Sequence, residues 1–195
     1  QGLAFDVVLH FATLCAIVYY YRLTLVEMSK DFACSIVTRK MQGQSMLAWA
    51  VLLGTIPVGL TGLFFKDTIE LNLRSYEVVA FATIFFGFLL GFSDWLHRFL
   101  GRSREFIRSS DILIVGLFQA LALIPGTSRS GITITAALLI GLSRSLSIKY
   151  AFLLSIPVIA LATLLKTFDL VNETNQVDWT LLLIGFVIAL ITSYT

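Results

Sequence analysis

Charged residues are scarce in this chain of 195 residues: they make up 13% of it, whereas a soluble domain has about 25%. Hydrophobic residues make up 57%, and the mean hydropathy is +0.89. The apolar runs are long enough for spanning helices, which need about 20 residues. They are not the alternating segments of about 10 residues that mark a membrane barrel. The scarcity of charge therefore excludes an ordinary soluble domain and predicts an all-α polytopic membrane protein.

Cysteine is also scarce, and the imbalance between positive and negative charge is small. The two cysteines, Cys15 and Cys34, have no metal-binding spacing, and we expect small apolar fillers rather than a disulfide. The net charge is +2, and the charges lie in short loops rather than on one face. No nucleic-acid partner is indicated.

Apolar spans are expected over residues 5–21, 46–65, 78–96 and 150–165, and from about residue 179 onward. Proline occurs only three times, and Pro57 and Pro157 lie inside two of these spans, where they predict kinks. The first residue is Gln, and apolar runs lie at both ends of the chain. We therefore expect a single transmembrane domain, residues 1–195, that is a piece of a longer membrane protein.

Positive charge is concentrated in two of the segments between spans. Residues 22–45 and 97–110 carry most of the bases, namely Arg22, Lys30, Arg39, Lys40, Arg98, Arg102, Arg104 and Arg108. Residues 66–77 and 166–178 carry more acids than bases. The positive-inside rule therefore places the first two segments in the cytoplasm and the other two outside.

Residues 111–142 form an apolar segment that is interrupted by Pro-Gly-Thr-Ser-Arg-Ser-Gly at residues 125–131. A full crossing would place the acidic segment 166–178 in the cytoplasm, whereas a segment that returns leaves it outside. The charges therefore favour a re-entrant hairpin of two half-helices. Half-helices of about 12 residues reach roughly 18 Å, past the midplane of a 30 Å core.

The interruption has the composition of an anion site. Arg129 is costly at bilayer depth, by about 2.5–3.5 kcal/mol, and such residues usually mark function. We expect Pro125 to end the first half-helix and Gly126 to turn the chain, with the second half-helix starting near Ser130. A helix N-terminus favours an anion, and a guanidinium suits phosphate. Hydroxyl donors would come from Thr127, Ser128 and Thr133. The alternative is a kinked helix with serine caps and Arg129 paired to a buried carboxylate.

Three other polar residues, Asp6, His10 and Gln119, have more than one possible role each. Asp6 could pair with Arg129 or bind a metal, although capping a helix is the commoner role. His10 could be a general base or a hydrogen-bonded packing residue. Gln119 could steady the interruption or join two helices. His97 is expected to be solvated.

Residues 119–134, QALALIPGTSRSGITI, resemble the signature of the bacterial undecaprenyl-diphosphate phosphatase family, the bacitracin-resistance proteins. Residues 5–10 and 152–157 resemble softer stretches of that family. The resemblance implies a multi-pass phosphatase of the bacterial inner membrane that removes the terminal phosphate from undecaprenyl diphosphate and recycles the lipid carrier for peptidoglycan. It also implies an inverted-repeat fold with two re-entrant hairpins.

Carried over to this chain, the resemblance makes Arg129 the phosphate clamp, with Ser128, Ser130 and Thr133 holding or attacking the phosphate. The remaining substrate-binding positions would be Pro125, Gly126, Thr127, Gly131 and Gln119. The nucleophile would be water or a serine, with Ser128 as the candidate.

The family's other motif, which is rich in glutamate and includes a histidine, does not occur in these 195 residues, and His10 does not match that histidine. The last family span is also missing. A divalent cation, Mg²⁺ or Ca²⁺, would help to neutralise the diphosphate, but its ligands would lie outside this sequence.

Expected partners are a polyprenyl diphosphate, membrane lipids and a second copy in a homodimer. A transporter or flippase for a polyprenyl phosphate and a catalytically inactive binding protein are the alternatives, because broken helices aimed at an anion also occur in transporters.

Overall fold

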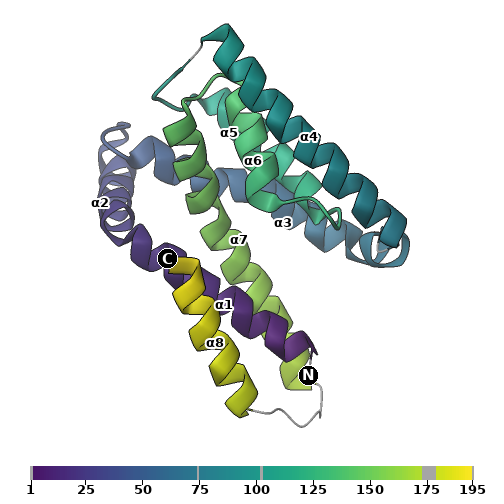
Figure 1. Cartoon of the computed structure of the whole chain (residues 1–195). Coiled ribbons are helices and arrows are strands. Elements are labelled where there is room, and N and C mark those ends of the chain that lie inside the picture. Colours follow the sequence, from purple (N-terminus) through teal and green to yellow (C-terminus); the bar gives the residue numbers. More distant parts are fainter. Residues whose placement is uncertain (1, 74, 102, 173–178, 195) are drawn as a thin grey trace. The chain divides into compact units, whose positions relative to one another are not determined.

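The computed structural model describes residues 2–73, 75–101, 103–172 and 179–194, and helices dominate all four ranges (Figure 1). In chain order the helices are α1 (Gly2–Tyr20), α2 (Arg22–Thr38), α3 (Ser45–Asn72), α4 (Tyr76–Leu100), α5 (Ser109–Ala120), the 3-10 helix η1 (Leu121–Leu123), α6 (Arg129–Leu139), α7 (Arg144–Asn172) and α8 (Trp179–Tyr194). Within these ranges the only β pairing is an isolated bridge between Arg104 and Leu142. The all-α prediction is confirmed.

Among the described residues, three helices are long and apolar enough to cross a membrane: Ser45–Phe65, Tyr76–Leu100 and Arg144–Leu165. Their ends follow local rules. The Ser75 side chain caps the first turn of α4 by accepting from the Val78 N–H, and Gly101 ends the helix in the left-handed region. Pro57 lies inside α3 and Pro157 inside α7 without ending either helix. These lengths confirm a polytopic membrane protein.

The polar segment after the first span is a helix rather than the loop that its charges predicted. Val7–Tyr20 and Arg22–Thr38 meet at a bend of 75°. Hydrogen bonds from the Tyr21 N–H to the Ile17 carbonyl and from the Leu25 N–H to the Tyr21 carbonyl carry the ladder through the bend. The charged residues of α2 lower its hydropathy without breaking its helix propensity, so hydropathy alone missed it.

The residues group into two compact units, Gln1–Glu27 with Ile156–Thr195 and Met28–Ser155. In the first unit α1 packs along α8. Phe11 stacks on Phe186 with ring centroids 6.1 Å apart. A Cβ on Gly185 would lie 2.6 Å from the Phe5 ring, so glycine lets the two helices approach closely.

In the second unit α3 packs on α5 and α4 on α6. The first of these contacts depends on small residues: a Cβ on Gly116 would lie 2.9 Å from the Gly54 carbonyl oxygen. Tyr150, at the start of α7, is fully buried and donates to the Ala50 carbonyl at 3.1 Å. Backbone approach and buried hydrogen bonds of this kind hold membrane helices together, since lipid tails are as apolar as the side chains.

α5 and α6 form the predicted hairpin, and its two ends are joined. The Arg104 N–H donates to the Gly141 carbonyl at 2.9 Å, and the Ser143 N–H donates to the Arg104 carbonyl at 2.8 Å. The Arg104 guanidinium also bonds Asp111 at 2.8 Å and the Ile140 carbonyl at 3.0 Å. The chain therefore leaves the hairpin at the end where it entered, as expected for a re-entrant segment. We call this end the base and residues 124–131 the tip.

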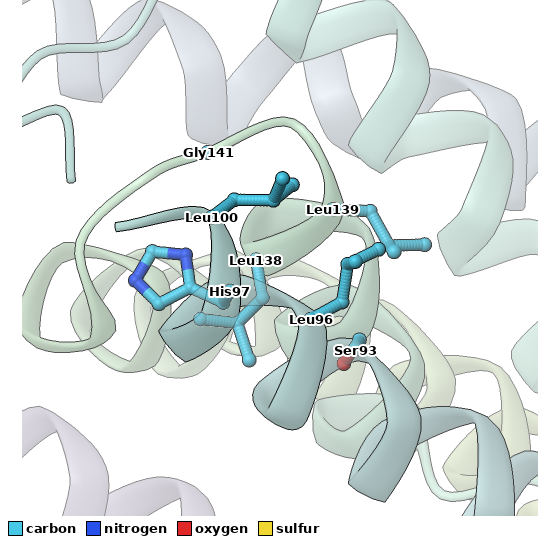
Figure 2. Close-up of a pocket in the computed structure, with 7 residues that line it drawn as sticks. All are labelled: Ser93, Leu96, His97, Leu100, Leu138, Leu139 and Gly141. Atoms are coloured by element: carbon cyan, nitrogen blue, oxygen red, sulfur yellow. The ribbon is translucent and has the colours of Figure 1, made fainter. Parts of the chain in front are cut away.

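The hairpin lies along α4 (Figure 1). At the base, α4 and the end of α6 enclose a cavity of about 10 Å³ lined by Ser93, Leu96, His97, Leu100, Leu138, Leu139 and Gly141 (Figure 2). At the tip, Gly126 lies against Val79 and Thr83. From His97 to Thr83 is about 21 Å at 1.5 Å per residue. An apolar membrane core is about 30 Å thick, so a tip at this distance from the base lies past the middle of such a core. It also lies well past the middle of α4.

His97 is not simply solvated, as the sequence led us to expect. Its Nδ1 atom is buried and has no hydrogen-bond partner among the described residues. The side chain points along the hairpin base beside Leu138 (Figure 2). The expectation failed because the end of α6 covers the last turn of α4, which no local pattern reveals.

Candidate anion-binding site

The tip begins where the first half-helix ends. Ile124 is extended, with ψ 119°, and Pro125 follows it. Pro125 has no N–H to continue a helix. The Thr127 N–H donates to the Ile124 carbonyl at 3.1 Å, which closes a turn around Gly126 at φ +93°. Such a φ favours glycine, so the Pro-Gly pair directly produces the turn.

The second half-helix begins at Arg129, one residue earlier than predicted, because Ser128 is its N-cap. The Ser128 hydroxyl oxygen accepts from the Gly131 N–H at 3.2 Å, and the Ser128 carbonyl accepts from the Ile132 N–H at 2.9 Å. The N–H groups of Arg129 and Ser130 find no acceptor in the described part of the chain. Two free donors and the positive end of the helix dipole therefore remain for an anion.

Arg129 occupies the first helical position, next to these donors, and is half-buried. The alternative prediction paired it with a buried carboxylate. Across residues 2–73, 75–101, 103–172 and 179–194, the ion pairs found join other residues, and none includes Arg129. The Asp6 side chain lies outside the described residues. An arginine fork without a carboxylate, beside free N–H groups, has the chemistry that binds phosphate.

The hydroxyl groups of the tip differ in availability. Thr133 is buried, and its hydroxyl bonds the carbonyls of Arg129 and Ser130, both at 3.0 Å. The Thr127 hydroxyl is buried without a partner among the described residues. Ser130 is half-buried, and its hydroxyl has no hydrogen bond within the same residues. Thr133 therefore braces the first turn of α6, while Thr127 and Ser130 keep free hydroxyls.

Gln119 lies before the tip and is fully buried. Its amide nitrogen donates to the Gly54 carbonyl at 3.2 Å, which joins α5 to α3. Its Oε1 atom has no partner in the described part of the chain. The contact agrees with the expectation that Gln119 joins two helices. The role of Gln119 in substrate binding stays a prediction. His10 is exposed on α1, in the other unit.

Sequence reasoning missed the surface on which the tip rests. The Thr83 hydroxyl of α4 lies 3.1 Å from the Gly126 carbonyl oxygen and 2.8 Å from the Val79 carbonyl oxygen. A Cβ on Gly126 would lie 2.4 Å from the Val79 carbonyl oxygen. A threonine within a run of phenylalanines gives no functional signal of its own, so only the fold could identify it.

Metal ions in proteins are usually held by His, Cys, Asp and Glu side chains. Among them, no group of three or more His, Cys, Asp or Glu side chains lies close enough to share a metal ion. The expectation that a divalent cation assists at the tip stays a prediction.

The fold and the tip define a class: a polytopic helical membrane protein whose broken-helix hairpin carries at its tip an arginine and N–H groups that have no acceptor among the described residues. More particularly, the chain belongs to the family described as bacitracin resistance protein BacA, whose model matches residues 1–195.

Curated relatives are similar along the whole chain. A protein named undecaprenyl-diphosphatase from Ruthia magnifica subsp. Calyptogena magnifica is 53% identical over 194 residues, which are 100% of this chain and 73% of that protein. One of the same name from Vesicomyosocius okutanii subsp. Calyptogena okutanii is 52% identical over 194 residues, 100% of this chain and 74% of that protein. A protein named undecaprenyl-diphosphatase 2 from Stutzerimonas stutzeri is 52% identical over 196 residues, with 100% and 73% covered.

Proposed function

We propose that this protein hydrolyses undecaprenyl diphosphate to undecaprenyl phosphate and inorganic phosphate, and that the terminal phosphate binds at the hairpin tip. Relatives that are about half identical over the whole chain carry the name of this activity. The observation that carries the proposal is Arg129 at the first position of α6, with free N–H groups and without a carboxylate among the described residues. The activity would recycle the lipid carrier for peptidoglycan synthesis, which accounts for resistance to bacitracin.

Phosphoryl transfer requires positioning and charge stabilisation more than covalent help. The Arg129 guanidinium and the N–H groups of Arg129 and Ser130 would hold the non-bridging oxygens of the terminal phosphate. Water adds its oxygen to the terminal phosphorus, the bond from that phosphorus to the bridging oxygen breaks, and undecaprenyl phosphate leaves with the bridging oxygen. The proton lost by the water passes to the products or to solvent.

Two serines could instead attack the phosphorus before water completes the hydrolysis. The Ser128 hydroxyl oxygen already accepts the Gly131 N–H, which makes it less nucleophilic, whereas the Ser130 hydroxyl is not engaged by the described residues. Ser130 is therefore the better candidate if the reaction is covalent. Ser128 then acts as a cap that fixes where α6 begins.

The membrane is the bacterial inner membrane in this proposal, with several crossings and the tip in its outer half. The hairpin base carries Arg98, Arg104 and Arg108, and the positive-inside rule places such segments in the cytoplasm. The tip lies about 21 Å further along α4. A diphosphate exposed on the outer surface would therefore reach it without crossing the membrane.

The prenyl chain and other lipids would contact the exposed apolar face of α4. Phe81, Phe85, Phe88 and Phe92 are all exposed there, and the first of them lies at the level of the tip. A divalent cation held by residues outside the described part would neutralise the diphosphate. A homodimer remains part of the proposal, to be tested by cross-linking in membranes.

The direct test is phosphate release from undecaprenyl diphosphate by the full-length protein in detergent. Arg129→Ala should lower kcat/KM by about 100- to 1,000-fold, as expected when one donor to the transition state is lost. Arg98→Ala is the matched control, because Arg98 is an exposed arginine paired with Asp94 on the same helix. It should keep activity within about twofold.

Two further results are informative. Loss of activity on adding a chelator, restored by Mg²⁺ or Ca²⁺, would support the cation. No release by a folded wild-type protein would overturn the proposed reaction and direct attention to transport of a polyprenyl phosphate.

A further inference from the structure

The tip is held against α4 by one polar side chain. Gly126 has φ +93° and no side chain, and a Cβ in its place would lie 2.4 Å from the Val79 carbonyl oxygen and 2.9 Å from the Thr83 hydroxyl oxygen. The tip backbone therefore touches α4 directly. Among the described residues, the Thr83 hydroxyl makes the one side-chain hydrogen bond from α4 to residues 124–131.

The group that Thr83 bonds is able to rotate. Glycine has the widest backbone freedom of any residue, so the peptide that joins Gly126 to Thr127 could flip with little steric resistance of its own. In the structure both the carbonyl group and the N–H group of this planar peptide have a hydrogen-bond partner. Its carbonyl oxygen lies 3.1 Å from the Thr83 hydroxyl, and its N–H donates to the Ile124 carbonyl, also at 3.1 Å.

This peptide unit directly precedes the anion site. Ser128, the cap of α6, follows it, and Arg129 comes next. A flip would break the turn between Ile124 and Thr127 and would move the cap and the first turn of α6. Displacements of about 1 Å at a reacting centre can lower the rate by about 100-fold. A flip of this one peptide would therefore change where the guanidinium and the N–H groups of Arg129 and Ser130 point.

Thr83 has a second possible hydrogen-bond acceptor besides the Gly126 carbonyl. Its hydroxyl lies 2.8 Å from the Val79 carbonyl oxygen of its own helix, the usual bond of a threonine within a membrane helix. The single hydroxyl hydrogen is within reach of both carbonyl oxygens. If the hydrogen served Val79 alone, the contact with Gly126 would be incidental.

We propose that Thr83 is a positioning residue for the reaction: it locks the peptide between Gly126 and Thr127 and so sets the start of α6, without touching the substrate itself. The inference rests on the proposed function for its kinetic test only. The lock itself is a property of the tip that is measurable without substrate.

The experiment compares Thr83→Val, Thr83→Ser and a matched control in the full-length protein. Valine keeps the shape and removes the hydroxyl, while serine restores it. The control is Thr55→Val, because among the described residues the Thr55 hydroxyl bonds only the Val51 carbonyl of its own helix, at 2.8 Å. Phosphate release from undecaprenyl diphosphate gives kcat and KM, and hydrogen exchange of the peptides that cover residues 121–131 reports the tip.

For Thr83→Val we expect kcat to fall about tenfold with KM within about twofold, and amide exchange at the tip to become faster. Thr83→Ser should restore both readouts, and Thr55→Val should change neither. Equal effects of the two valine variants, or loss of folded protein without a change in the kcat of the remaining enzyme, would overturn the positioning role.

The two proposals fail in different ways. If the wild type releases no phosphate, the proposed function fails, and tip exchange alone decides the lock. If the wild type is active but Thr83→Val has normal kcat and normal tip exchange, the lock fails and the proposed function stands.

Discussion

The base and the tip of the hairpin each contain an arginine at membrane depth or close to it, and the two arginines are used in opposite ways. At the base, Arg104 bonds Asp111, the Ile140 carbonyl and the Phe106 carbonyl. At the tip, Arg129 stands beside free N–H groups and has no ion pair among the described residues. An arginine whose donors are paired stabilises the fold, whereas one without a protein partner is available to a ligand, which supports a structural role for Arg104 and the proposed phosphate-binding role for Arg129.

The first prediction concerns the base and carries the largest effect. Arg104→Ala leaves Asp111, which is 3% exposed, without its ion-pair partner and also removes the guanidinium bond to the Ile140 carbonyl at the base of the hairpin. Breaking such a pair costs about 3–5 kcal/mol, so we expect a large loss of stability in detergent unfolding. Arg98→Ala, which breaks an exposed pair, should cost less than about 1 kcal/mol. Equal stabilities of the two variants would contradict the inference that the Arg104–Asp111 pair stabilises the fold more than the exposed Arg98–Asp94 pair does.

The second prediction concerns the turn at the tip. Gly126→Ala combines an unfavourable φ of +93° with a Cβ 2.4 Å from the Val79 carbonyl oxygen, so the tip must leave α4. We expect a loss of about 1–3 kcal/mol in stability and a larger loss of phosphate release. The control is Gly101→Ala, where φ is +60° but no atom lies within 4 Å of the added Cβ. That variant should lose some stability and keep its activity.

The third prediction separates charge from geometry at Arg129. Arg129→Lys keeps the positive charge but loses the planar fork, so phosphate would be bound through one donor instead of two. We expect kcat/KM to fall about tenfold, less than for Arg129→Ala, with an unchanged unfolding midpoint. Full activity in the lysine variant would mean that only the charge matters at the tip.

The fourth prediction is the smallest and tests the cap. Ser128→Ala removes an N-cap, as Ser75→Ala does at the start of α4, and each should lower stability by about 1 kcal/mol. If Ser128 only caps, the loss of activity should be modest. Loss of all phosphate release from a folded Ser128→Ala protein would instead support Ser128 as the nucleophile.

Much of the site was predictable because its signals are local. The Pro-Gly pair, the serine cap and the arginine lie within five consecutive residues, 125–129. Their positions in an apolar segment sufficed to predict the hairpin that the structure shows, whereas the anion site at its tip stays a prediction. The α2 helix was not predictable from hydropathy, because its charges resemble those of a loop.

Sequence by itself determined the class of protein, the return of the hairpin and the composition of its tip, because transfer energies, helix breakers and loop charges act over short stretches of chain. Only the tertiary structure decided which polar groups are satisfied. Arg104 reaches a carbonyl 36 residues away, Thr83 one 43 residues away, and Gln119 one 65 residues away. A polar group in a membrane protein becomes structural or functional according to whether a distant segment brings it a partner, and that depends on how the helices pack.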